Sequence, residues 1–153
     1  MSRKFLKTLA IAGAVLLVAA QLKRPDLTNP PTDASKTLAV SLAVPADVAV
    51  ILKRSCADCH SHETSWPWYS RVSPVSWWLL QHVDHARKDL NLSTWGTYSA
   101  GRKNRKLNQI CEQVEQKAMP LPSYLLLHPG ARLSDADRAR LCEWTKSLAE
   151  SEE

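Results

Sequence analysis

The residues best suited to chemistry are two cysteines and a histidine in the stretch Cys56-Ala-Asp-Cys59-His60. Two thiols three residues apart can reach the two vinyl groups on one edge of a haem and form thioethers with them. The next residue, His60, then lies where its imidazole can bind the iron as the proximal ligand. The spacing therefore predicts one covalently bound c-type haem, held by Cys56 and Cys59.

Three other interpretations of these residues stay open. A structural zinc site could use Cys56 and Cys59 with His60 or His62, although no second ligand pair has zinc-finger spacing. A thioredoxin-type redox pair needs alternating strands and helices, and the sequence has no convincing strand pattern. A plain disulfide between Cys56 and Cys59 is strained at this spacing.

A second axial ligand is expected nearer the C-terminus, where Met119 is the only methionine besides Met1. Met119 follows a predicted helix and precedes residues 120–122, whose two prolines stiffen the loop. A thioether ligand favours reduced iron and raises the reduction potential. Core filling is the alternative role for Met119, and His82 is its main rival as sixth ligand. Weaker candidates are His62, His85 and His128.

Helices have to position these residues, and apolar periodicity predicts five of them. They are expected at about 34–43, 46–54, 74–90, 102–118 and 135–149. Pro45 and Pro74 suit first helical turns, and Ser134 with Asp137 resembles a capping box before the last helix. The pattern predicts an all-α domain.

The other two cysteines, Cys111 and Cys142, fall on the apolar faces of the fourth and fifth predicted helices. In an oxidising compartment such a pair favours a disulfide. Two buried thiols are the alternative.

An aromatic stretch, Trp66-Pro-Trp-Tyr69, follows the cysteine motif closely. Trp66 and Tyr69 could wall the haem edge or donate hydrogen bonds to its propionates. Arg71 could pair with a propionate through its planar guanidinium. Ordinary core packing is the alternative for the aromatic residues.

Residues 1–20 have the pattern of a secretory signal, with basic residues before an apolar run from Leu9 to Ala20. Small residues before Gln21 would allow cleavage. If the segment is retained, residues 5–22 would tether the protein to the inner membrane, and a buried N-terminal helix is the third alternative. Both export outcomes place the rest of the chain in the periplasm. Residues 21–33, which contain three prolines, are expected to form a linker to a haem-binding domain over 34–153.

Basic residues outnumber acidic ones by 20 to 15, but three of the basic residues lie in the first 20 positions. The remainder has 17 basic and 15 acidic residues, so we expect no nucleic-acid partner. One basic cluster at 102–106 is either a solvated helix start or a docking patch for an acidic partner.

Further motifs accompany Cys56-Ala-Asp-Cys-His60 along the chain. They are Trp66-Pro-Trp-Tyr69, Pro74-Val-Ser-Trp77, Leu90-Asn-Leu-Ser-Thr-Trp95, Met119-Pro120 and Tyr124-Leu-Leu-Leu-His128-Pro129. Together they resemble the bacterial haem-binding domain family related to cytochrome c, over nearly the whole chain beyond residue 20. The resemblance implies a small helical cytochrome-c-like fold with covalent haem. It carries over Cys56, Cys59 and His60 as attachment residues and proximal ligand, and it suggests Met119 as the distal ligand.

The expected function is electron transfer by a mono-haem protein with His60 and Met119 as axial ligands and a redox partner protein. No catalytic residue is expected in such a carrier. Two alternatives need a displaceable sixth ligand. One is a peroxidase-like enzyme, in which His82 could act as an acid–base group, and the other is a haem-based sensor of a small gas.

Overall fold

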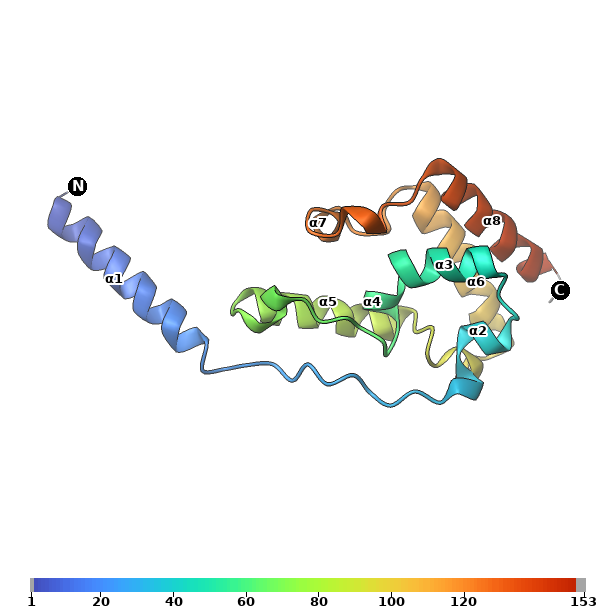
Figure 1. Ribbon diagram of the computed structural model, residues 1–153, viewed down its shortest axis with the longest axis horizontal. Coiled ribbons are helices and arrows are strands. Elements are labelled where there is room, and N and C mark those ends of the chain that lie inside the picture. The colour runs from blue at the N-terminus through green and yellow to red at the C-terminus, as the bar shows by residue number, and fades with distance from the viewer. Residues whose placement is uncertain (1, 151–153) are drawn as a thin grey trace. The chain divides into compact units, whose positions relative to one another are not determined.

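The computed structural model describes residues 2–150, and its regular elements are all helices (Figure 1). They are α1 (Arg3–Ala20), α2 (Leu38–Ser41), α3 (Ala46–Ser55), α4 (Ala57–His60), α5 (Val75–Asp89), α6 (Ala100–Glu115), α7 (Pro122–Leu125) and α8 (Asp135–Glu150). Short 3₁₀ turns cover Ala34–Lys36, Trp68–Arg71, Trp95–Thr97 and Pro129–Ala131. No strand occurs within residues 2–150, so the predicted all-α class is confirmed.

The chain forms two compact units. The N-terminal unit comprises the described residues up to Thr28 together with Ser65–His85. The core unit comprises Asn29–Thr64 together with the described residues from Ala86 onward. The cysteine motif and Met119 both lie in the core unit.

The predicted helix limits hold well for α3, α5 and α8 but fail at two places. The helix expected at 34–43 is interrupted at Thr37, which adopts an extended conformation and caps α2 by accepting from the Val40 N–H at 3.4 Å. The helix expected at 102–118 begins at Ala100 and ends at Glu115, because Lys117 takes a left-handed conformation with φ 57°. Helix periodicity carries no signal for either backbone change.

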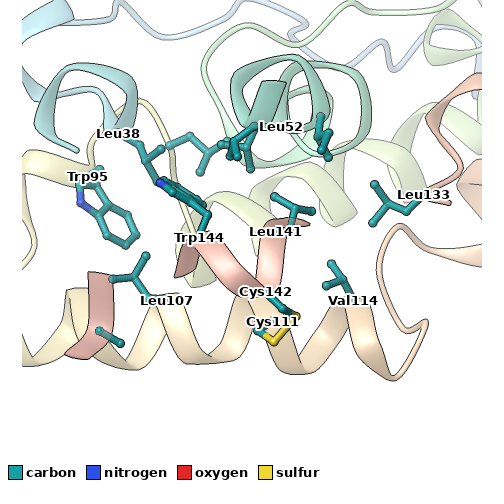
Figure 2. Packing of buried hydrophobic residues seen from close by; sticks show 14 residues of the cluster. Leu38, Leu52, Trp95, Leu107, Cys111, Val114, Leu133, Leu141, Cys142 and Trp144 are labelled. Carbon is teal, nitrogen blue, oxygen red and sulfur yellow. A yellow bond between two sulfur atoms is a disulfide. The ribbon is translucent and has the colours of Figure 1, made fainter. Parts of the chain in front are cut away.

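One apolar cluster fills the core unit (Figure 2). Helix α6 packs against α8, and α3 packs against both α8 and α4. Trp95 and Leu141 are fully buried in this cluster, and α3 contributes Val48, Ile51 and Leu52. The helix that leads into the cysteine motif is therefore anchored by burial of its apolar face.

The disulfide expected between Cys111 and Cys142 is present and joins α6 to α8 within the apolar cluster, with 4.6 Å between the Cα atoms (Figure 2). Both cysteines are buried. The bond fixes the two longest helices of the core unit to each other.

The start of α8 has the predicted capping box. The Ser134 N–H donates to Asp137 Oδ2 at 2.8 Å, and the Asp137 N–H donates to Ser134 Oγ at 3.0 Å. Asp137 also pairs with Arg54 of α3 at 2.8 Å. The Ser134 backbone N–H, followed by the Ser134 hydroxyl and Arg54, holds the pKa of Asp137 below its ordinary value. The same carboxylate thus starts α8 and links it to α3.

Helix α1 buries none of its side chains. After it, Gln21 binds the backbone of Ser73: its Nε2 donates to the Ser73 carbonyl at 2.9 Å, and its Oε1 accepts from the Ser73 N–H at 3.0 Å. The Trp77 indole N–H donates to the Lys23 carbonyl at 2.8 Å. Within residues 2–150, no helix combines the length and the apolar character that crossing a membrane requires.

Replacing Cys111 and Cys142 together with Ala should lower the free energy of unfolding by about 3–4 kcal/mol, because the cross-link reduces the entropy of the unfolded chain. Urea unfolding measures this change. Reducing agent should lower the wild-type midpoint to that of the variant and leave the variant unaffected. A wild-type midpoint that ignores the reducing agent would contradict the assignment.

Candidate functional site

The cysteine motif occupies a tight turn at the end of α3. Cys56 leaves helical geometry with φ −124° and ψ −37°, yet its N–H still donates to the Leu52 carbonyl at 2.9 Å. The Cys56 carbonyl in turn accepts from the N–H groups of Cys59 at 3.2 Å and His60 at 2.9 Å. Cys56, Cys59 and His60 therefore share one turn, which is fixed to a helix anchored in the core.

Both thiols of the motif are free and partly buried. Burial, assisted by Cys59, raises the pKa of the Cys56 thiol to about 12. Burial, assisted by Asp58, raises the pKa of the Cys59 thiol to about 11. Both groups are thus protonated thiols at neutral pH. A thioredoxin-type pair needs alternating strands and helices, and no strand occurs within residues 2–150, so the fold does not support that interpretation.

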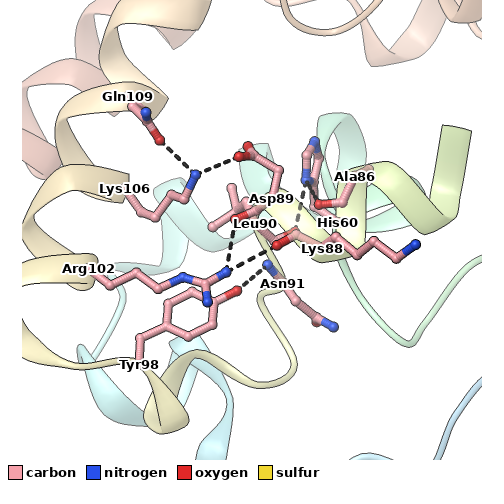
Figure 3. Close-up of polar contacts among 10 residues, drawn as sticks. All are labelled: His60, Ala86, Lys88, Asp89, Leu90, Asn91, Tyr98, Arg102, Lys106 and Gln109. Carbon is pink, nitrogen blue, oxygen red and sulfur yellow. Dashed lines mark hydrogen bonds and ion pairs between the residues drawn. The ribbon is translucent and has the colours of Figure 1, made fainter.

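His60 is oriented by the last turn of α5 (Figure 3). Its Nδ1 lies 3.2 Å from the Ala86 carbonyl oxygen and 3.0 Å from that of Leu90. Carbonyl oxygens only accept, so Nδ1 carries the proton and donates, which leaves the lone pair on Nε2. Burial lowers the pKa of His60, against the opposing effect of the two carbonyls. The result is a neutral imidazole whose Nε2 can bind a metal.

The carbonyl groups around His60 are held in turn by α6 (Figure 3). Arg102 donates to the carbonyls of Lys88 at 3.1 Å and Asp89 at 3.4 Å, while its guanidinium lies 4.0 Å from the centre of the Tyr98 ring. Lys106 pairs with the Asp89 carboxylate at 2.6 Å. Two cations of the 102–106 cluster are thus engaged inside the core unit, which favours a helix start over a free docking patch.

Arg87 fixes the loop that follows the motif. Its Nε donates to the Ser61 carbonyl at 2.8 Å, and one terminal nitrogen donates to Thr64 Oγ1 and to Asn29 Oδ1, both at 2.9 Å. Thr64 donates onward to the Asp58 carbonyl at 2.6 Å. Sequence reasoning missed Arg87, since no local pattern reports a contact across 26 residues. It also placed Asn29 in a linker, although its side chain belongs to this network.

Met119 follows a hydrogen-bonded end of α6. Lys117 is left-handed; its N–H donates to the Val114 carbonyl at 3.2 Å, and the Ala118 N–H donates to the Gln113 carbonyl at 3.0 Å. This is the Schellman pattern of helix termination. The Met119 N–H also donates to Gln113, at 3.2 Å, and Met119 is half-buried. The backbone that delivers the predicted distal ligand is thereby fixed at its start.

His82, His62 and His128, which are rival candidates for the distal position, contact other groups of the protein. His82, in the N-terminal unit, donates from Nδ1 to the Trp78 carbonyl at 2.9 Å. His62 uses both ring nitrogens: Nδ1 donates to the Pro31 carbonyl at 3.1 Å, and Nε2 accepts from Asn91 Nδ2 at 2.9 Å. Met119 as distal ligand, and His82 as its rival, stay predictions. His128 stacks on Tyr124 with 4.1 Å between ring centres, and His85 is exposed.

The predicted haem-edge residues Trp66, Tyr69 and Arg71 all lie in the N-terminal unit. The Trp66 indole nitrogen is buried without a hydrogen-bond partner among residues 2–150. The Tyr69 ring meets Trp68 edge-on at 5.8 Å, and Arg71 is exposed. Their predicted role beside a haem stays a prediction.

The motif does not have the geometry of a zinc site. Within residues 2–150, the group of ligand atoms close enough to surround one metal ion belongs to Cys111, Glu115 and Cys142, and two of these are joined as the disulfide. The ligand atoms of Cys56, Cys59 and His60 do not converge in this way.

The comparisons with known proteins agree with this chemistry. The family model described as a haem-binding domain matches residues 15–147. No curated protein and no solved structure matches the chain.

Lys117→Gly should raise the free energy of unfolding by about 0.5–1 kcal/mol, because glycine adopts the left-handed conformation without the steric cost that a side chain carries. The neighbouring Gln116→Gly, at a right-handed position with φ −69°, should destabilise instead and is the matched control. Urea unfolding of both variants provides the measurement. Equal destabilisation by both would contradict the Schellman ending before Met119.

Proposed function

Because this chain belongs to the haem-binding domain family, we propose that it is a mono-haem c-type electron carrier working outside the cytoplasm. The family establishes a haem-binding domain. Covalent attachment, the two axial ligands and electron transfer are the content of the proposal.

The donor set on α4 carries the proposal. Two protonated thiols that are not bonded to each other lie on one turn with an imidazole whose Nε2 can bind metal. Cys56 and Cys59 would hold the haem through thioether bonds, and His60 would bind its iron. Protonated thiols suit this attachment, because each S–H adds across a carbon–carbon double bond and no oxidant is needed.

The carbonyl groups of Ala86 and Leu90 give His60 its function. They fix the ring orientation and the tautomer, and by accepting hydrogen bonds from Nδ1–H they make Nε2 a stronger electron-pair donor to a metal. When bound, haem supplies reversible one-electron exchange between Fe(III) and Fe(II). Arg102 and Lys106 hold the same helix end in place, so the ligand geometry can stay unchanged through both oxidation states.

We assign the distal position to Met119. It lies in the core unit with His60, half-buried, at the end of a fixed helix terminus. A thioether on one side and an imidazole on the other would fill both axial positions. That arrangement favours a carrier over a peroxidase-like enzyme or a gas sensor, each of which needs an open or displaceable position.

The proposed location is the periplasm, with residues 1–20 as the export signal and a redox protein as partner. Three basic residues precede the apolar helix α1, as in a secretory signal. The Cys111–Cys142 disulfide supports an oxidising compartment.

An optical spectrum of the protein, secreted together with c-haem maturation factors, tests the proposal. Wild type should show low-spin c-type bands and the far-red sulfur-to-iron band when oxidised. Met119→Ala should keep the haem but lose the far-red band and become high-spin. His82→Ala is the control and should match wild type.

Two results would overturn this assignment. If Met119→Ala matches wild type while His82→Ala changes spin state, the distal ligand is His82. If wild type is itself high-spin and binds carbon monoxide or turns over peroxide, the sensor or enzyme alternative holds.

A further inference from the structure

A hydrogen bond joins the cysteine motif to a distant segment of the core unit. The Tyr124 hydroxyl donates to Asp58 Oδ2 at 2.7 Å, across 66 positions of the chain. Asp58 lies between Cys56 and Cys59 in the motif, and Tyr124 lies in α7. A hydroxyl bound to a carboxylate at this distance is a charge-assisted hydrogen bond, roughly twice as strong as a neutral one.

Helix α7 begins three residues after Met119. Its single turn is closed by the Tyr124 and Leu125 N–H groups, which donate to the Leu121 carbonyl at 3.0 and 3.1 Å. Pro120 and Pro122 restrict the chain between Met119 and this turn. Because these prolines stiffen the connection, a displacement of the Tyr124 side chain also displaces the Met119 backbone.

Apolar packing contributes little to holding α7 in place. The helix has no buried residue, and the two leucines that follow it, Leu126 and Leu127, are 81% and 64% exposed. Tyr124 is half-buried and also stacks on His128, with 11° between the ring planes. The bond to Asp58 is thus a main attachment of this segment to the motif.

We propose that Tyr124 is a positioning residue for Met119. Its bond to Asp58 ties the loop that carries the distal ligand to the turn that carries Cys56, Cys59 and His60. This inference rests on the proposed function, in which Met119 binds the iron. The Schellman ending of α6 fixes one side of Met119, and the Tyr124–Asp58 bond fixes the other.

Carbon monoxide binding to the reduced, haem-loaded protein tests the proposal, because carbon monoxide competes with Met119 for the iron. Tyr124→Phe should raise the apparent affinity by about tenfold, the effect of losing one hydrogen bond to a charged group. Ser147→Ala is the control: it removes a hydroxyl that donates to the Trp144 carbonyl at 2.8 Å within α8. It should leave the affinity unchanged.

A second pair of variants removes the same bond from the other side. Asp58→Ala should raise the affinity as Tyr124→Phe does, and the double variant should show no further rise, because both changes remove one interaction. Asp58→Asn keeps an acceptor without the charge and should give an affinity between those of wild type and Asp58→Ala. Amide hydrogen exchange of the full chain gives a readout independent of the iron: exchange at 121–128 should be faster in Tyr124→Phe than in Ser147→Ala.

The outcomes separate this inference from the proposed function. If Met119→Ala loses the far-red band but Tyr124→Phe matches Ser147→Ala in affinity and exchange, the positioning role is wrong and the carrier assignment stands. Additive effects of Asp58→Ala and Tyr124→Phe would equally overturn the role. If Met119→Ala leaves the spectrum unchanged, the assignment of Met119 as distal ligand fails and the positioning role fails with it.

Discussion

The hydrogen bonds from His60 Nδ1 to the Ala86 and Leu90 carbonyls are the constraint on which the rest of the core unit depends. They leave Nε2 as the nitrogen that can bind iron, and they require the last turn of α5 to lie against α4. A backbone hydrogen bond holds the same two segments together, because the Leu92 N–H donates to the His60 carbonyl at 2.7 Å. Arg102 then holds the neighbouring α5 carbonyls from α6. The half-buried imidazole of His60 is thus held in one orientation, as a candidate ligand requires.

The segment that carries Met119, the candidate distal ligand, is held by different interactions from those that hold His60. The apolar cluster and the Cys111–Cys142 disulfide fix α6 to α8, and the end of α6 then sets the path of the chain towards Met119. Beyond Met119, Pro120 is buried, but α7 itself has no buried residue. The hydrogen bond from Tyr124 to Asp58 helps to hold α7 to the cysteine motif. Separate interactions therefore hold His60 and the loop that carries Met119. Both sets include a residue of the cysteine motif.

Local sequence patterns predicted three helices closely, whereas the attachment chemistry that they indicate stays a prediction. Periodicity placed α3, α5 and α8, and the Ser134–Asp137 pattern marked the start of α8. The left-handed Lys117 was not predictable, because a lysine carries no signal for that conformation. Arg87 and Asp58 were missed for another reason: their partners lie 23 to 66 positions away, and one sequence does not report such pairings. Tyr124 belongs to one of the motifs shared with the resembled family. That motif marked Tyr124 as a residue of interest, but the spacing of the motif did not indicate its role.

Acid extraction followed by intact-mass measurement tests the central claim most directly. Protein secreted with c-haem maturation factors should keep its red colour in acidified organic solvent and carry the added mass of one haem. The Cys56→Ala/Cys59→Ala variant should carry none. Haem that is extracted from wild type, leaving the mass of the bare chain, would contradict covalent attachment at Cys56 and Cys59.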